Sequence, residues 1–234
     1  IINGDMQVAQ RGTSTASITA TGFYTCDRWK IEDSTDATLT NTQESLTSGD
    51  AFADGFSKSI KYDVTTADAS LGASQYAFLR YNFEGQDMQL FKKGSSTAET
   101  YTVSFWVKST KTGTQILEFW DTTNSRSCCK SYTIDTTDTW EYKVLNYPAD
   151  TTGAIANTNA GGMALFFWLC AGSNYTGGTL STTWTAYSDT NRAVGQVNNF
   201  DSTSNNFEIT GVQLEVGEYT SSTIPPFQHE SYGD

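Results

Sequence analysis

The side chains with the clearest binding chemistry gather in one turn-rich segment, GGTLSTTWTAYSDTNR at residues 177–192. It places aromatic rings close to an acid, an amide and a guanidinium, namely Trp184, Tyr187, Asp189, Asn191 and Arg192. The apolar face of a pyranose ring stacks on an aromatic ring while its hydroxyls meet such polar groups. Because binding residues concentrate on long loops, this segment is the preferred candidate for sugar binding. The alternative is that its aromatic rings plug gaps in the fold.

Two strand-like segments each add a tryptophan. Side chains alternate between the two faces of a β-strand, so Trp106 in YTVSFWVKS shares the more polar face with Lys108. By the same rule, Trp120 in ILEFWD lies beside Glu118 and away from the apolar residues. Both rings are candidates for ligand binding. The alternative for each is that it covers a sheet edge or contacts a neighbouring subunit.

Groups suited to catalysis are few. His229 is the only histidine, and a Ser-His-Asp or Cys-His arrangement would depend on it. With 26 acidic residues, some carboxylates will lie close together by chance, so a pair does not by itself indicate glycoside hydrolysis. No glycine-rich phosphate loop follows a strand into a helix. The sequence therefore predicts no catalytic residue, no cofactor and no enzymatic activity.

Charge and apolar runs exclude several partners. The formal net charge is −12, and no stretch concentrates basic residues, which argues against nucleic acid and against anionic membranes. The longest apolar run, MALFFWLCA at residues 163–171, is too short for membrane insertion and is predicted to be a buried central strand. It is apolar on both faces, and alternation puts Phe166, Trp168 and Cys170 on the same face. No signal peptide or initiator methionine is visible, which suggests a processed chain or an excised piece.

The cysteines show neither paired CxxC spacing nor neighbouring histidines, so a zinc site is not expected. Cys128 and Cys129 are adjacent and would point to opposite faces of a strand. We therefore expect free thiols, as in a protein made in a reducing cytoplasm, rather than a disulfide framework.

Two-residue alternation of apolar side chains recurs along the chain, separated by turn-rich pieces, and predicts an all-β fold. Seven or eight antiparallel strands of this kind favour a two-sheet antiparallel β-sandwich, or jelly roll, with long loops. The expected strands span residues 56–64, 76–83, 101–109, 115–121, 130–135, 140–147, 163–171 and 207–216.

Other segments carry weaker patterns. Residues 13–54 are expected to be long loops or loose edge strands, and DMQLFKKG at residues 87–94 a single helical turn docked by Met88, Leu90 and Phe91. In the last strand Ile209 is out of phase with Val212, and Gly211 between them is where a bulge or a strand start is easiest. We expect Val212 to face the core beside the first strand and Ile209 to serve a different neighbour.

Blocks along nearly the whole chain resemble the β-sandwich domains of phage and prophage tail-fibre proteins, which are similar in turn to carbohydrate-binding jelly rolls. These blocks are NGDMQVAQRGTS, CDRW, NFEGQDMQLFKKG, YTVSFWVKSTKTGT, SYTIDTTDTWEYK, LCAGSNY and NNFEITGVQLEVG. The resemblance implies a lectin-like domain on a virion appendage, made in the host cytoplasm, that recognises a host surface glycan and assembles with other fibre subunits as a homotrimer. It covers residues 1–234 as one domain, with residues 218–234 as an extended tail.

The resemblance also raises a structural calcium ion, which related jelly rolls hold between an acidic first strand and an acidic last strand. Here Gln7 and Thr210 occupy such positions, and Asp5 and Glu208 are the acids that remain, so no metal ligand is assigned. Two other functions stay open at this point. One is a structural trimeric fibre or capsid-decoration domain, and the other is a polysaccharide depolymerase.

Overall fold

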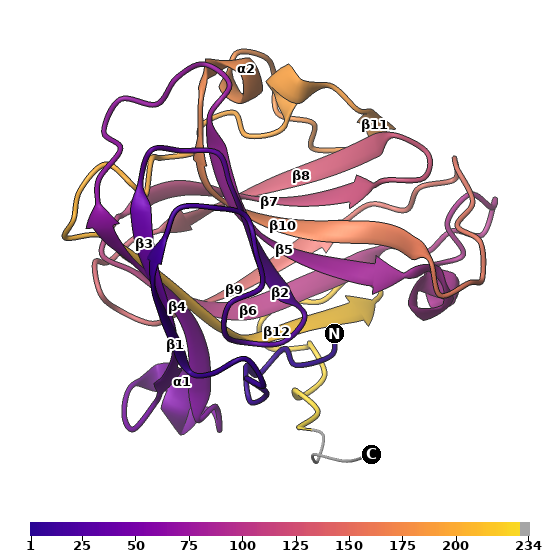
Figure 1. Ribbon diagram of the computed structural model, residues 1–234. Helices are drawn as coiled ribbons and strands as arrows, with labels where there is room; N and C mark the ends of the chain where they lie inside the picture. Colours follow the sequence, from indigo (N-terminus) through magenta and orange to yellow (C-terminus); the bar gives the residue numbers. More distant parts are fainter. Residues whose placement is uncertain (230–234) are drawn as a thin grey trace.

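Two antiparallel β-sheets of six strands each lie face to face in the computed structural model of the protein, which describes residues 1–229 (Figure 1). Sheet A has the spatial order β1 (Ser14–Ile18), β3 (Thr38–Ser45), β4 (Lys58–Thr66), β12 (Asn206–Val216), β6 (Tyr101–Ser109) and β9 (Glu141–Tyr147). Sheet B has the order β11 (Thr185–Ala186), β8 (Arg126–Ile134), β7 (Gly113–Asp121), β10 (Gly161–Ala171), β5 (Tyr76–Glu84) and β2 (Trp29–Asp33). The short helical turns are α1 (Asp50–Ala53), η1 (Gly85–Phe91), α2 (Ser173–Thr176) and η2 (Asp189–Asn191). The predicted all-β sandwich is confirmed.

The main core fills the space between the two sheets. Alternation turns one face of each strand inward, so Phe105 of β6 and Phe167 of β10 are fully buried and meet edge to face at 5.0 Å. Trp106 and Trp120 point away from this core, because their neighbours Phe105 and Phe119 point into it. The predicted faces of both tryptophans are therefore confirmed.

A second apolar cluster lies on the outer face of sheet B. Phe166 and Trp168 of β10 belong to it, and both are fully buried. Tyr175 and Leu180 pack against this cluster from the segment that we call the cover loop, residues 172–197. The prediction that β10 is apolar on both faces is confirmed. Cys170, however, lies in the main core and not beside Trp168, because the strand register shifts between these two residues.

The N-terminal region is more regular than its sequence predicts. β1 and β2 are edge strands, in line with the expectation, but β3 is an interior strand between β1 and β4. Its buried Asn41 explains how a Thr-rich strand can be interior, because the amide accepts from Thr25 Oγ1 at 2.6 Å and donates to Lys61 O at 3.0 Å. The helical turn is also longer than expected, and Leu90 is 75% exposed instead of docked.

A bulge in β12 explains the phase change around Gly211. The register with β6 shifts between Thr210 and Gln213, and Gly211 has a φ of +62°. The bulge restores the phase, so Ile209 and Val212 both lie in the main core with no exposed surface. Of the two alternatives at Gly211, the structure has the bulge and not a strand start, whereas the expectation that Ile209 serves a different neighbour is wrong. Val212 N donates to Gly4 O at 2.9 Å, as expected for a last strand beside the first segment.

The remaining predictions have mixed outcomes. All four cysteines lie within the described residues, and all are buried and free. None of the helices in residues 1–229 has the length and apolar character needed to cross a membrane. The expected tail, residues 218–234, is described as far as His229, and its last five residues lie outside the described part. The extent of the domain over residues 1–234 stays a prediction.

Candidate functional site

The outer face of sheet B, which points away from the main core, combines aromatic and polar side chains in rows across its strands. The cross-strand register gives one row with Lys30, Arg80, Phe166 and Glu118, and a neighbouring row with Asn82, Ala164, Trp120 and Ser127. Each row draws on strands that are far apart in the sequence. Residues that are far apart along the chain therefore lie side by side on this face. Arg80 and Trp120 are partly exposed there, whereas Phe166 and Glu118 are buried.

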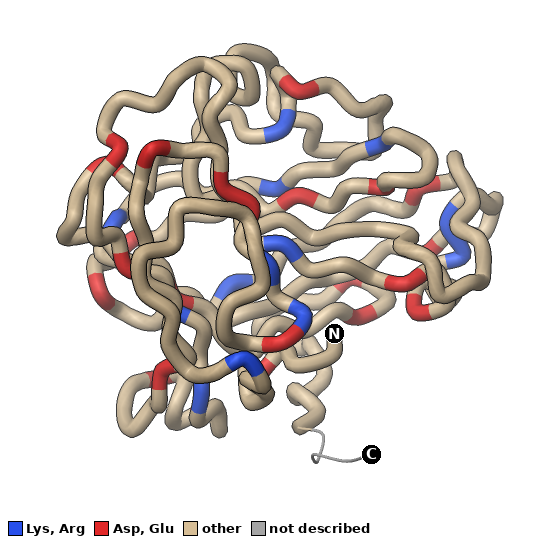
Figure 2. Tube along the Cα trace, in the orientation of Figure 1, with Lys and Arg blue, Asp and Glu red and all other residues tan. Residues whose placement is uncertain are grey.

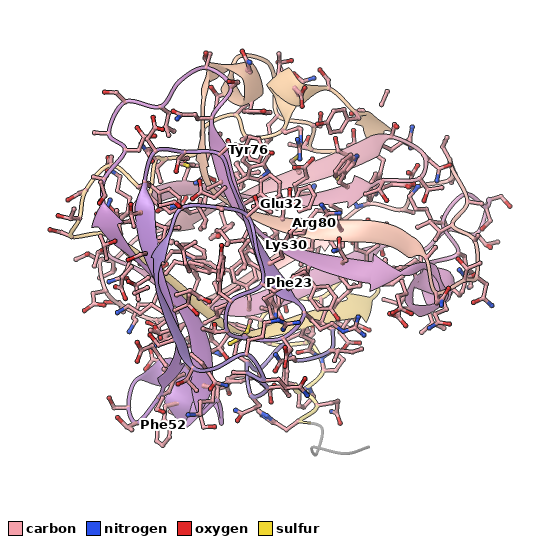
Figure 3. All side chains as sticks on the ribbon, in the orientation of Figure 1. Phe23, Lys30, Glu32, Phe52, Tyr76 and Arg80 are labelled. Carbon is pink, nitrogen blue, oxygen red and sulfur yellow. The ribbon has the colours of Figure 1, made fainter. Side chains whose placement is uncertain are left out.

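One end of this face is a polar array on β2 and β5. Arg80 donates to Glu32 Oε1 at 2.7 Å and to Asn82 Oδ1 at 2.7 Å, and Lys30 Nζ lies 3.2 Å from Glu32 Oε1. The Arg80 guanidinium also lies 5.3 Å from the centroid of the Phe166 ring. Figure 3 shows Lys30, Glu32 and Arg80 along the neighbouring strands, with Tyr76 farther along β5. The partly exposed groups offer a ligand both donors and acceptors over an aromatic base.

The other end is aromatic, and three of the residues predicted from the sequence meet there. The rings of Trp120 and Tyr187 lie 5.3 Å apart. The Arg192 guanidinium lies 4.9 Å from the centroid of Tyr187 and 5.5 Å from that of Trp120. It also lies 4.9 Å from the Trp168 ring, so the cation is surrounded by aromatic faces.

A buried ion pair fixes the cover loop on this face. Arg192 Nε donates to Glu118 Oε1 at 2.8 Å, and Trp168 Nε1 donates to Glu118 Oε2 at 2.9 Å. Burial raises the pKa of Glu118, and Arg192 partly offsets that increase. For Arg192, burial alone would lower the pKa, but the Glu118 carboxylate raises it above its ordinary value. The pair therefore holds residues that are far apart in sequence in one geometry.

Tyr187 connects the ion pair to solvent. Its hydroxyl donates to Asp189 Oδ1 at 2.5 Å and accepts from Arg192 Nη1 at 2.8 Å. Burial raises the pKa of Tyr187, and the hydrogen bond to Asp189 raises it further, so the phenol stays protonated at neutral pH. The Asp189 side chain is 54% exposed, which leaves an acceptor at the rim of the face.

The structure does not bring the other two loop candidates to this face. Trp184 lies in the main core and is 9% exposed, with its Nε1 donating to Pro148 O at 3.1 Å. Trp184 therefore fills a gap in the fold, which is the alternative given above for the aromatic residues of this loop. Asn191 accepts from the backbone N–H of Thr179 at 3.1 Å and so holds the cover loop in shape.

Trp106 lies on the outer face of sheet A, so it does not join Trp120. Its ring lies 5.2 Å from that of Tyr142, and its Nε1 donates to Asp54 Oδ2 at 3.1 Å. It therefore belongs to a different surface from the other predicted residues.

Sequence reasoning did not single out the polar end of the outer face. The signal was present in YAFLRYNF, where alternation puts Phe78, Arg80 and Asn82 on one face. In the sequence alone, Arg80 and Asn82 look like ordinary solvent-facing residues. Only the cross-strand register shows that Arg80 lies opposite Phe166 and Asn82 opposite Ala164. Figure 2 shows the same mixture on a larger scale, with Lys and Arg positions interspersed among Asp and Glu.

The acids considered for a calcium ion have other partners. Glu208 Oε2 lies 2.9 Å from Lys108 Nζ, and Ser59 donates to the other carboxylate oxygen. Asp5 Oδ2 lies 3.6 Å from His229 Nδ1. Within the described part of the chain, no group of three or more His, Cys, Asp or Glu side chains is arranged to hold a metal ion.

No protein-family model matches the chain, and no curated protein matches it. Several solved structures are similar to the chain at low sequence identity. The enzymatically active domain of tailspike protein 4 from bacteriophage CBA120 is 12% identical with a TM-score of 0.42, and the match covers 81% of this chain and 19% of that one. The chain thus spans about a fifth of the tailspike structure.

Two other matches cover both chains almost fully. A candidate sugar-binding protein from Bacteroides thetaiotaomicron is 14% identical with a TM-score of 0.48, over 92% of this chain and 98% of that one. A family 11 carbohydrate-binding module from Clostridium thermocellum, solved with a mixed-linked tetrasaccharide, is 10% identical with a TM-score of 0.41, over 88% and 97%. All three TM-scores are below 0.5, so these similarities do not determine what this chain binds.

Proposed function

We propose that this chain is a glycan-binding domain without catalytic activity, and that it binds its ligand on the outer face of sheet B. The observation that carries the proposal is that two chemistries meet on this face, with aromatic rings at β7 and the cover loop and a polar array on β5 and β2, on either side of β10. The ring centroids of Trp120 and Tyr187 lie 5.3 Å apart. Arg80 is hydrogen-bonded to Glu32 and Asn82 in a polar array. Sugar rings need both, because they present an apolar C–H face and a rim of hydroxyls.

Unsatisfied polar atoms on the same face support this proposal. Among residues 1–229, Trp120 Nε1 and Ser127 Oγ are buried without a hydrogen-bond partner. The two residues face each other across β7 and β8. Buried polar atoms without partners are uncommon. Because neither atom is exposed, a ligand hydroxyl would satisfy them only if the side chains around them shift.

We further propose that the domain belongs to a phage tail fibre or related virion appendage and recognises a host cell-surface glycan. This part rests on the sequence blocks that resemble tail-fibre β-sandwiches. Affinity at one site would be weak, and a homotrimer would add avidity by presenting several copies of the face.

Binding to an array of bacterial surface polysaccharides tests the proposal. The wild-type chain should bind at least one polysaccharide, and Arg80→Ala or Trp120→Ala should weaken that binding at least about tenfold, which corresponds to about 1.4 kcal/mol. Arg11→Ala and Phe52→Ala are matched controls, because the Arg11 side chain is 49% exposed and Phe52 is 43% exposed, both outside the proposed face. Both controls should bind like the wild type.

Two results would contradict the proposal. The first is the absence of binding by the wild-type chain to every polysaccharide on the array. The second is binding that is unchanged in both Arg80→Ala and Trp120→Ala. Release of reducing ends from a bound polysaccharide would refute the non-enzymatic part while leaving the binding face in place.

A further inference from the structure

A pocket of about 540 Å³ lies on the outer face of sheet A, beneath the C-terminal segment of residues 221–229. Its volume falls within the roughly 300–1,000 Å³ that ligand pockets occupy. We call it the tail pocket. It is separate from the outer face of sheet B, because the main core lies between the two sheets.

The floor of the tail pocket depends on the bulge in β12. The Phe56 ring lies directly against Gly211, where a Cβ atom would come within 2.6 Å of Phe56 Cζ. The Phe227 ring then meets Phe56 edge to face at 5.0 Å and closes one side. The glycine therefore makes room for an aromatic floor, and the C-terminal segment supplies a wall.

The aromatic pair of Trp106 and Tyr142 also lines the pocket. These two residues face each other across β6 and β9, and their rings lie 5.2 Å apart at an angle of 41°. Both are only partly buried and both line the pocket. A strand-borne aromatic pair of this kind is a rigid platform on which an apolar ring face can stack.

The polar groups of the pocket are mainly acceptors. Asp54 receives one hydrogen bond, from Trp106 Nε1, and keeps further acceptor sites on its carboxylate. Gln213 uses its amide hydrogens on Glu215 Oε1 at 2.9 Å and Pro225 O at 3.1 Å, so it offers a ligand its carbonyl oxygen. Among the described residues that line the pocket, none is Lys or Arg, and the imidazole of the lining residue His229 faces the Asp5 carboxylate, with Nδ1 3.6 Å from Oδ2. The ligand should therefore donate several hydrogen bonds and carry no negative charge.

We propose that the tail pocket binds a neutral pyranose ring, as a second glycan site independent of the outer face of sheet B. The ring would stack on Trp106 and Tyr142 and donate hydroxyls to Asp54 and Gln213. Uronic acids and phosphorylated sugars would be repelled by Asp54, since the described lining holds no Lys or Arg and the imidazole of His229 faces the Asp5 carboxylate instead.

The test uses the indole N–H resonance of Trp106 in the whole chain, assigned by its loss in Trp106→Phe. Methyl glycosides of glucose, galactose and mannose are titrated in turn, with methyl glucuronide as the charged probe. At least one neutral glycoside should shift this resonance, because its hydroxyls compete at Asp54, the acceptor of that N–H. Methyl glucuronide should bind at least about tenfold more weakly than the matching glucoside.

Three variants sharpen the result. Tyr142→Ala should lower the affinity for the neutral glycoside at least about tenfold, which is about 1.4 kcal/mol. Asp54→Asn keeps the size of the side chain but removes the charge, so it should narrow the gap between glucoside and glucuronide even if Tyr142→Ala folds poorly. Trp120→Ala, on the other sheet, should leave the titration unchanged.

The proposal is overturned if no neutral glycoside shifts the Trp106 resonance, or if glucuronide binds as tightly as glucoside. It is also overturned if Asp54→Asn leaves the discrimination between the two unchanged. These outcomes leave the proposed function untested, because that function is tested separately by the binding of Arg80→Ala and Trp120→Ala to the polysaccharide array. The site on the outer face of sheet B and the site in the tail pocket can therefore be refuted independently of each other.

Discussion

Replacing Arg192 with methionine should destabilise the fold by about 3–5 kcal/mol at neutral pH, the usual cost of removing one partner from a buried ion pair. The Arg192 side chain is 6% exposed and the Glu118 side chain is fully buried, so solvent cannot replace the lost guanidinium. The variant keeps Trp168 Nε1 as a donor to Glu118, at 2.9 Å. It leaves the carboxylate without a charged partner beneath the cover loop.

The loss should depend on pH in a defined direction. Burial raises the pKa of Glu118, and Arg192 partly offsets this increase, so its removal raises the folded-state pKa further. The folded variant then holds a proton that the unfolded chain releases above about pH 4. The free energy of unfolding should therefore fall as pH rises from about 4 toward the folded-state pKa and level off above it. The difference from wild type is smallest in acid and largest at neutral pH.

Urea unfolding followed by tryptophan fluorescence, at a series of pH values from about 4 to 8, measures this effect. Adding Glu118→Gln to Arg192→Met removes the titrating group, so the double variant should recover part of the stability and lose the extra pH dependence. Arg11→Met is the surface control, with a side chain 49% exposed, and should cost less than about 1 kcal/mol. A loss of under about 1 kcal/mol for Arg192→Met at neutral pH, or an equal loss at both ends of the series, would refute the reasoning.

Two further predictions concern stability. Gly211→Ala should cost about 1–3 kcal/mol more stability than Gly12→Ala in thermal or urea unfolding. Both glycines have positive φ, but only at Gly211 would a Cβ atom press against Phe56. Equal losses of stability would show that Phe56 moves away from the new Cβ atom at little cost. Lys93→Met should cost about 3–5 kcal/mol, because the Lys93 ammonium is buried between two carboxylates, whereas Lys92→Met, at a side chain 53% exposed, should cost under about 1 kcal/mol. Similar melting curves for the two lysine variants would contradict the second prediction.

The sequence predicted the faces of Trp106 and Trp120 because alternation along a strand is a local property. What each ring contacts is not local. Trp120 meets Tyr187 because the cover loop is fixed by Arg192 and Glu118, which are 74 positions apart. Arg80 and Asn82 acquire a role only through the cross-strand register, which no single segment encodes.

Loop side chains were the least predictable part of the candidate site. Trp184 and Tyr187 lie three positions apart in one segment, yet the first enters the main core and the second lies on the outer face of sheet B. Trp184 is held by its bond to Pro148 O and by Lys93 Nζ, 5.2 Å from its ring centroid. Both partners come from distant segments. The prediction for Ile209 was wrong for a related reason. A bulge or a strand start at Gly211 was predicted, but the phase of the strand after it was not.

The adjacent Cys128 and Cys129 lie in two different layers of the molecule. Cys128 is part of the main core between the sheets, whereas Cys129 belongs to the cluster under the cover loop. Burial raises the pKa of Cys128 to about 12 and that of Cys129 well above its ordinary value, so neither reacts readily until its own layer opens. Alkylation of Cys129 needs the cover loop to lift, and alkylation of Cys128 needs the sheets to separate. The alkylation rates of these two neighbouring thiols would therefore report two different motions. Cys129 would report the opening of the cover loop, and Cys128 the separation of the two sheets.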